Sequence, residues 1–186
     1  SHVTAAVFNG PNEMEVREVE SPQAGTGEVL VEVGANTVCG TDVRILRGEK
    51  TTGIHPPSIL GHEFAGRVAD VGEGVEGYEV GSTVAASPII PCRRCFYCQH
   101  DMENVCLNWK AMGYEVNGGL SQYVRVPTDA VEAGCLFPTR GDIPPHQLPR
   151  PRCHARRPRC RARPRQPLRL GATLGPGTRE ADAPPR

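Results

Sequence analysis

The sequence has few aromatic residues and no long hydrophobic run, and both features limit the classes of protein it can belong to. Aromatic residues make up 5% of the 186 positions, and none follows Phe137. No apolar stretch reaches the about 20 residues that a membrane-spanning helix needs. The first residues, S-H-V-T-A-A-V-F, lack the basic start and apolar core of a secretory signal. We therefore expect a cytoplasmic protein with no membrane partner.

The formal net charge is zero, but the two signs of charge are unevenly distributed. Residues 1–139 hold 18 acidic and 9 basic residues, whereas residues 140–186 hold 3 acidic residues and 12 arginines without a lysine. The second segment also carries 10 of the 18 prolines. Such a composition cannot bury much apolar surface. The sequence predicts one domain over residues 1–139 and an Arg/Pro-rich, disordered tail over residues 140–186 that is not a domain.

Four of the eight cysteines fall within fifteen residues at the spacing C-x2-C-x2-C-x7-C. They are Cys92, Cys95, Cys98 and Cys106. This spacing brings four soft thiolates within reach of one tetrahedral ion, most simply Zn2+. Four thiolates leave no open coordination position, so we expect a structural zinc lobe over residues 91–107.

Two other interpretations of this cysteine cluster are less favourable. A ferredoxin-type run usually closes with a gap of three residues and a proline, but here the last gap is seven and Leu107 follows. Cysteines so close together on a short loop rarely have the geometry of a good disulfide. His100 lies inside the lobe, but four thiolates already complete a zinc shell.

The order of short alternating segments predicts a mainly β fold. An opening hairpin is expected over residues 4–19, a longer strand over residues 28–38 and a short helix from Thr41 to Leu46. Further strands are expected at residues 64–71, 83–86 and 120–126. Many short strands with glycine turns and little helix favour a partly open β-barrel.

A second group of metal-ligand residues lies outside the lobe. Cys39 and the pair His62-Glu63 each follow or precede an expected strand, and together they offer the thiolate, imidazole and carboxylate of an open zinc site. Spacing alone is weak support, because a lone cysteine is often a packed thiol and a lone histidine often an ordinary core or surface residue.

Several motifs occur in an order that resembles the zinc-containing medium-chain alcohol and polyol dehydrogenases. They are C-G-T-D at residues 39–42, G-H-E-F-A-G-x-V at residues 61–68, a glycine-bounded element at residues 77–84, the four-cysteine lobe, and G-G-L-S-Q-Y-V at residues 118–124. The resemblance covers about residues 3–138.

The resemblance implies a GroES-like barrel as the catalytic domain, followed in the family by a Rossmann domain that binds NAD or NADP. The implied activity is oxidation of a primary or secondary alcohol with hydride transfer to NAD(P). The implied partners are a small alcohol, polyol or sugar alcohol, and intact relatives are homodimers or homotetramers. Zn2+ is then both a structural and a catalytic cofactor.

The resemblance also assigns roles to individual residues. Cys39 and His62 match the first two catalytic-zinc ligands, and Glu63 matches an acid beside the metal. Asp42 matches the carboxylate that orients the liganding histidine, and Thr41 matches the hydroxyl that passes the substrate proton onward. The cysteines at positions 92, 95, 98 and 106 match the structural zinc lobe.

Simpler roles exist for most of these residues. Either Thr41 or Asp42 would also serve as a helix cap, and Glu63 would also serve as a surface acid. Cys135 fits a buried thiol. Trp109, Met112 and Tyr114 fit either a substrate cleft or ordinary packing.

The resemblance stops near residue 139. No G-x-G-x-x-G turn follows, since the glycines at residues 171–177 read G-A-T-L-G-P-G, and no third zinc ligand is recognisable unless Cys153, His154 or Cys160 replaces it. We hypothesise a frameshift near residues 139–145, with a chain inactive as written.

A stand-alone zinc-binding module with a basic tail is the alternative function. It would act by interaction, with nucleic acid as a candidate partner. The tail lacks the aromatic interleaving that would support nucleic-acid binding.

Overall fold

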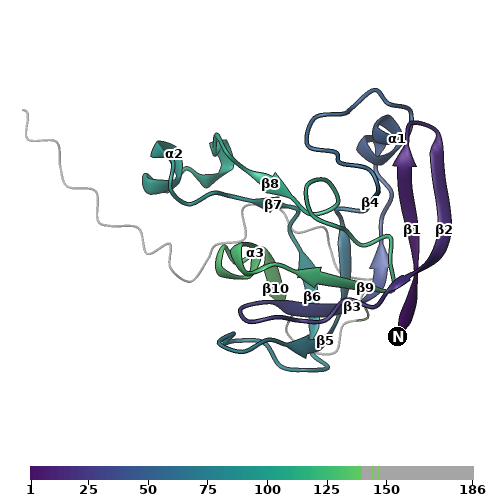
Figure 1. The fold of residues 1–186 in the computed structure, drawn as a ribbon. Helices are drawn as coiled ribbons and strands as arrows, with labels where there is room; N and C mark the ends of the chain where they lie inside the picture. Colours follow the sequence, from purple (N-terminus) through teal and green to yellow (C-terminus); the bar gives the residue numbers. More distant parts are fainter. Residues whose placement is uncertain (140–143, 145, 147–186) are drawn as a thin grey trace, which may run out of the picture. The chain divides into compact units, whose positions relative to one another are not determined.

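A computed structural model describes residues 1–139, Pro144 and His146, and its strands dominate the fold (Figure 1). The strands are β1 (His2–Gly10), β2 (Glu13–Glu20), β3 (Val29–Asn36), β4 (Ser58–Ile59), β5 (Phe64–Val71), β6 (Thr83–Ala86), β7 (Ile89–Ile90), β8 (Lys110–Ala111), β9 (Tyr123–Val126) and β10 (Leu136–Pro138). The mainly β class expected from the sequence is confirmed.

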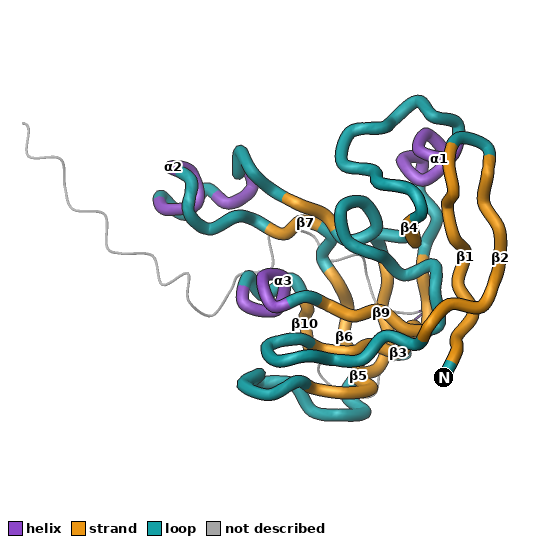
Figure 2. Tube along the Cα trace, in the orientation of Figure 1, coloured by secondary structure: helices purple, strands orange, loops and turns teal. Residues whose placement is uncertain are grey.

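The helices are all short, as Figure 2 shows by colour. They are α1 (Gly40–Leu46), α2 (Phe96–Gln99), the 3-10 helix η1 (Glu103–Val105) and α3 (Thr128–Glu132). Within the described part of the chain, no helix has the length and apolarity required to cross a bilayer.

The strands form three sheets, and hydrogen bonds outside the regular strands connect two of them. The sheet orders are β2-β1-β4, β10-β6-β5-β3-β9 and β7-β8. The amide of Ala6 donates to the Leu120 carbonyl at 2.8 Å, and the amide of Gln122 donates to the Thr4 carbonyl at 3.1 Å. β1 therefore joins the segment that leads into β9, which gives the partly open barrel that was expected.

The expected opening hairpin is present as β1 and β2, which pair antiparallel from His2 opposite Glu20 to Gly10 opposite Glu13. Asn12 adopts a left-handed φ of 62° in the connecting turn, a conformation that asparagine tolerates better than most residues. β2 is an edge strand whose side chains are nearly all exposed. Its alternating sequence therefore reflects strand propensity rather than one buried face.

Two groups of buried side chains hold the barrel together. The larger lies between β3, β5, β6 and β9, and includes Val29, Val68 and Val126, each with at most 1% of its surface exposed. The smaller contains Phe8, Ile45, Leu60, Ala111 and Tyr114. Leu60 is fully buried two residues before His62, so the smaller cluster fixes the chain beside this candidate ligand.

Gly61 and Gly118 lie where other backbone atoms approach too closely for a side chain. A Cβ at Gly61 would lie 2.7 Å from the Leu120 amide, and one at Gly118 would lie 2.8 Å from the Leu60 carbonyl. Gly61 also has a left-handed φ of 92°. The two motifs that carry these glycines therefore pack directly against each other.

Several boundaries differ from the sequence-based expectation. β3 ends at Asn36 rather than residue 38, β9 begins at Tyr123 rather than residue 120, and α1 begins at Gly40 rather than Thr41. The chain before Tyr123 bonds to β1 through Leu120 and Gln122, although the Gln122 carbonyl also accepts the Val33 amide of β3 at 2.9 Å. The sequence also failed to predict α3, which starts directly after Pro127.

The predicted disordered tail, the frameshift site and the substitute ligands Cys153, His154 and Cys160 lie outside the described residues. The glycine segment at residues 171–177 also lies there.

Replacing Leu60 with alanine tests the smaller cluster. The change leaves a cavity at a fully buried position, so Leu60→Ala should lower the free energy of unfolding by about 2–5 kcal/mol. Val80→Ala is the matched control, because Val80 is 68% exposed in a turn and should cost about 0.5 kcal/mol or less. Urea unfolding at a fixed zinc concentration measures both, and equal losses would contradict this packing.

Two candidate metal centres

The four lobe cysteines converge although they lie on loops and short helices. Their sulfur atoms all lie within 4.8 Å of one another. Cys95 Sγ is 3.5 Å from Cys98 Sγ and 3.9 Å from Cys106 Sγ. These distances exceed the about 2.05 Å of a disulfide and fit the about 3.8 Å expected between thiolates bound to one tetrahedral zinc.

Local backbone geometry creates this convergence. Arg93 has a left-handed φ of 56°, which turns the chain sharply between Cys92 and Cys95. Ile89 pairs with Ala111 and Ile90 with Lys110, so the β7-β8 pair closes the base of the lobe. The segment between β7 and β8 is thus a loop of about twenty residues, which is closed by the pairing of the two strands and by the converging thiols.

The charge states of the thiols also favour a bound cation. Backbone hydrogen bonding at Arg94 lowers the pKa of Cys92 to about 6. Burial, together with the neighbouring thiols, raises the pKa of Cys98 to about 12. Without a cation the cluster therefore resists full ionisation, whereas a divalent ion would stabilise all four thiolates.

His100 is not part of this cluster. Its Nδ1 lies 2.7 Å from the Phe96 carbonyl oxygen, and its ring stacks on the Phe96 ring with centroids 4.2 Å apart. The sequence-based choice of four thiolates over His100 agrees with this geometry.

The second centre forms where two antiparallel strands meet. β3 pairs with β5, with Asn36 opposite Phe64, so residues just after β3 lie beside residues just before β5. Cys39 Sγ and His62 Nε2 consequently approach to 3.1 Å although they are 23 residues apart. Cys39, His62 and Glu63 together offer three ligand atoms within 4.8 Å of one another.

Asp42 combines the two roles that the sequence left open. Its Oδ2 accepts a hydrogen bond from the Cys39 amide at 2.9 Å, while its Oδ1 faces His62 Nδ1 at 3.3 Å. Cys39 is the true N-cap of α1, because its sulfur accepts the Thr41 amide at 3.3 Å. The expectation that Thr41 or Asp42 is the cap was therefore wrong, since Asp42 instead completes a capping box from the third helical position.

Burial and neighbouring charges shift the pKa values of Cys39 and His62. Burial opposes ionisation of Cys39, but hydrogen bonds from Thr41 and Asp42 and the charge of His62 outweigh it and lower the thiol pKa. The hydrogen bond with Asp42 raises the pKa of His62 against the effect of burial. With Nδ1 facing Asp42, the His62 ring turns Nε2 toward Cys39, which is the ring orientation of a metal-binding histidine.

Glu63 is held by a residue that the sequence analysis did not identify. The Thr37 hydroxyl donates to Glu63 Oε2 at 2.5 Å, and the Thr37 amide donates to the Glu63 carbonyl at 2.9 Å. The other carboxylate oxygen, Oε1, lies 3.9 Å from His62 Nε2. Glu63 is thus part of the site and not a detached surface acid.

Tyr114 covers one side of His62, with ring centroids 5.3 Å apart, and the Thr41 side chain hydrogen-bonds to it. The Lys50 ammonium lies 4.4 Å from the Tyr114 ring centroid. Of the three aromatic or sulfur residues left open by the sequence, Met112 is buried in the core and Trp109 is 43% exposed. Cys135 is a buried thiol, as expected, and donates to the Ile89 carbonyl.

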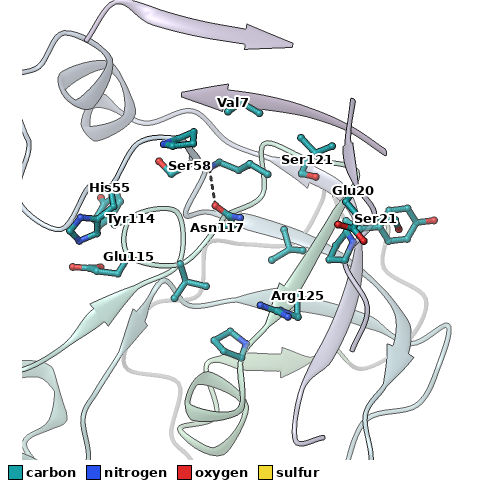
Figure 3. A pocket seen from close by; sticks show the side chains of 18 of the residues that line it. Val7, Glu20, Ser21, His55, Ser58, Tyr114, Glu115, Asn117, Ser121 and Arg125 are labelled. Atoms are coloured by element: carbon teal, nitrogen blue, oxygen red, sulfur yellow. Dashed lines mark hydrogen bonds between the residues drawn. The ribbon is translucent and has the colours of Figure 1, made fainter. Parts of the chain in front are cut away.

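A groove of about 960 Å³ lies on another part of this barrel, between the β1-β2 hairpin and the loop around Asn117. Figure 3 shows Tyr114 and His55 along one wall and Glu20 along the opposite wall. None of the candidate metal ligands lines it. Tyr114 is shared, since it lines the groove and also contacts His62.

Comparison with known proteins identifies this fold. A sequence model of the alcohol dehydrogenase GroES-like domain matches residues 25–134. The chain belongs to this family. The match contains both candidate metal centres.

Relatives of this GroES-like domain are dehydrogenases. L-threonine 3-dehydrogenase of Pyrococcus furiosus is 42% identical over 119 residues, which cover 63% of this chain and 34% of that protein. A Sinorhizobium meliloti protein solved as a zinc-binding dehydrogenase bound to NADP has a TM-score of 0.71 and 35% identity, covering 78% of this chain and 41% of that one. A cobalt- and zinc-bound alcohol dehydrogenase from Pyrobaculum aerophilum has a TM-score of 0.66 and 31% identity, covering 76% and 43%.

The chain spans about a third of the length of the curated relatives it matches. Within that third, the sequence analysis missed Thr37 and the packing of Tyr114 on His62. A hydroxyl residue at the end of an expected strand was the signal for Thr37, but its partner lies 26 residues away.

Asp42→Asn tests the electrostatic part of this GroES-like site. An asparagine side chain retains an acceptor for the Cys39 amide but removes the charge facing His62. The His62 pKa, which Asp42 raises, should therefore fall in the metal-free protein, as followed by NMR titration. Asp70→Asn, on an exposed part of β5, is the control that should leave His62 unchanged. An unshifted His62 in Asp42→Asn would refute the coupling.

Proposed function

We propose that residues 1–139 form the catalytic domain of a zinc-dependent dehydrogenase that oxidises a primary or secondary alcohol, polyol or sugar alcohol, with NAD or NADP as hydride acceptor. One observation carries this proposal: a single domain holds a closed four-cysteine cluster and a separate mixed thiolate, imidazole and carboxylate group. A closed site suits a structural ion, and a mixed site with three protein ligands suits a catalytic one.

The four lobe cysteines would hold the structural ion. Their sulfur spacing and their four soft sulfur donors both fit Zn2+. The lobe has little hydrophobic core of its own, and Phe96 and Leu107 are 62% and 69% exposed. A bound ion would therefore supply much of the free energy that folds this segment.

Cys39, His62 and Glu63 would hold the second ion. Their donor types fit zinc, and the 3.1 Å approach of Cys39 Sγ to His62 Nε2 supports a shared ion at this group. When bound, Zn2+ supplies Lewis-acid polarisation of an alcohol hydroxyl.

The protein's own groups orient this centre and offer a route for the proton. Asp42 Oδ1, 3.3 Å from His62 Nδ1, would orient the ring so that Nε2 meets the metal beside Cys39. The hydroxyl of Thr41 would accept the proton of a substrate hydroxyl, and the interactions of Thr41 with Cys39 and Tyr114 support this role.

The coenzyme would bind outside the described domain. In the described part of the chain, a G-x-G-x-x-G pattern occurs at residues 72–77, but it joins β5 to β6 and opens no helix, so it is not a turn of the dinucleotide-binding type. We therefore propose that this chain, tested alone, binds metal but does not turn over an alcohol. The six cysteines of the described part form no disulfide with one another, which fits a reducing compartment such as the cytoplasm.

Metal content tests this proposal directly. The purified chain should contain two zinc ions by elemental analysis. Cys106→Ala and His62→Ala should each lower the content to about one ion, because they lie in different centres. Cys135→Ala is the matched control, since Cys135 belongs to neither group. A wild-type chain that keeps its fold without stoichiometric zinc would refute the metal-dependent function.

An activity assay complements the metal count. Incubation with NAD or NADP and a panel of alcohols and polyols should give no reproducible NAD(P)H, whereas joining the domain to the coenzyme domain of a relative should restore turnover that needs His62. Reduction of the coenzyme by the chain alone would overturn the inactivity. Two metal ions with a fused enzyme that stays inactive would favour a stand-alone zinc-binding module.

A further inference from the structure

The Thr37–Glu63 contact is a short hydrogen bond between residues far apart in sequence. The Thr37 hydroxyl lies 2.5 Å from Glu63 Oε2, in the range of a strong O–H···O⁻ bond. Backbone pairing supports it, because the Thr37 amide donates to the Glu63 carbonyl at 2.9 Å. Two contacts thus fix the same pair of residues.

Strand register produces this contact. β3 ends at Asn36 and β5 begins at Phe64, and these two residues are paired. Thr37 and Glu63 are the next residues on each side, so their backbone bond extends the ladder by one step. The side chain of Glu63 therefore lies beside the Thr37 hydroxyl at the second centre.

The two carboxylate oxygens of Glu63 make different contacts. Oε2 accepts the Thr37 hydroxyl, while Oε1 is 3.9 Å from His62 Nε2. A free glutamate samples many rotamers, and holding one oxygen removes much of that freedom before metal arrives. The remaining oxygen is directed toward Cys39 and His62.

We propose that Thr37 is a positioning residue that holds Glu63 so that Oε1 serves as the third protein ligand of the second metal centre. This inference rests on the proposed function, because it requires that centre to bind an ion. Thr37 touches neither the metal nor the substrate and acts only through Glu63. Residues that hold a metal ligand by a hydrogen bond typically change metal affinity by about 10- to 100-fold when removed.

The position of Thr37 makes the test clean. Thr37 is exposed, so a valine of similar shape removes the hydroxyl without creating a buried cavity. Serine keeps the hydroxyl and loses only the methyl group, and alanine provides a second variant that lacks the hydroxyl.

The experiment titrates Co2+ into the metal-free 186-residue chain against a chromophoric chelator under reducing conditions. The four-thiolate lobe should fill first, with strong sulfur-to-cobalt charge-transfer absorption, and the second ion should give d–d bands with weaker charge transfer. Thr37→Val and Thr37→Ala should weaken the second step by about 10- to 100-fold and alter its d–d bands, with the first step unchanged. Thr37→Ser should behave like wild type.

A double-variant comparison separates positioning from general structure. Glu63→Gln should weaken the second step by itself, and Thr37→Val added to Glu63→Gln should cause no further loss. Equal second-step affinity in wild type and Thr37→Val would overturn the positioning role while leaving the proposed function intact. A further loss in the Glu63→Gln background would also overturn it, because the effect would not pass through Glu63. A wild-type chain that binds only one cobalt ion would refute both the second centre and this inference.

Discussion

The antiparallel pairing of β3 with β5 is the constraint on which the candidate catalytic centre depends. It places residues 37–39, which follow β3, beside residues 62–63, which precede β5. Thiolate, imidazole and carboxylate then gather without any of them lying inside a regular strand. The paired strands hold the backbone rigid, and the segments directly after β3 and directly before β5 carry the metal-ligand side chains. Rigid elements with functional groups at their ends are a common way to hold reactive side chains in place.

Asp42 shows how little sequence is needed to stabilise such a centre. One carboxylate oxygen accepts the Cys39 amide and starts α1, while the other faces His62. The beginning of a helix and the orientation of a ligand are thereby determined together. Asp42 is buried, so its charge acts in a medium that screens it less than water does. Local backbone geometry and site electrostatics are coupled through a single residue.

The two candidate centres are supported by different kinds of backbone structure. The lobe is built from nearby residues on turns, and three of its thiols lie within or directly beside helices of only three or four residues. The second centre is built on a packed barrel, with Leu60 and Gly61 fixing the approach to His62. Loss of metal would therefore affect them differently: the lobe would lose its main cross-link, whereas the second centre would retain its strand framework.

Sequence alone determined the lobe, the mainly β class and most strands, because each depends on local pattern. Four thiols within fifteen residues of a short loop are necessarily close in space. The segment at residues 64–71 forms the strand that its alternation predicted. The helix that starts directly after Pro127 was not predicted from the sequence. Tertiary structure alone decided which distant residues meet: Thr37 with Glu63, and Tyr114 with His62. The reason is physical: these contacts depend on strand register and on the close approach of two backbones at glycine residues. The spacing of the contacting residues along the sequence specifies neither the register nor the close approach.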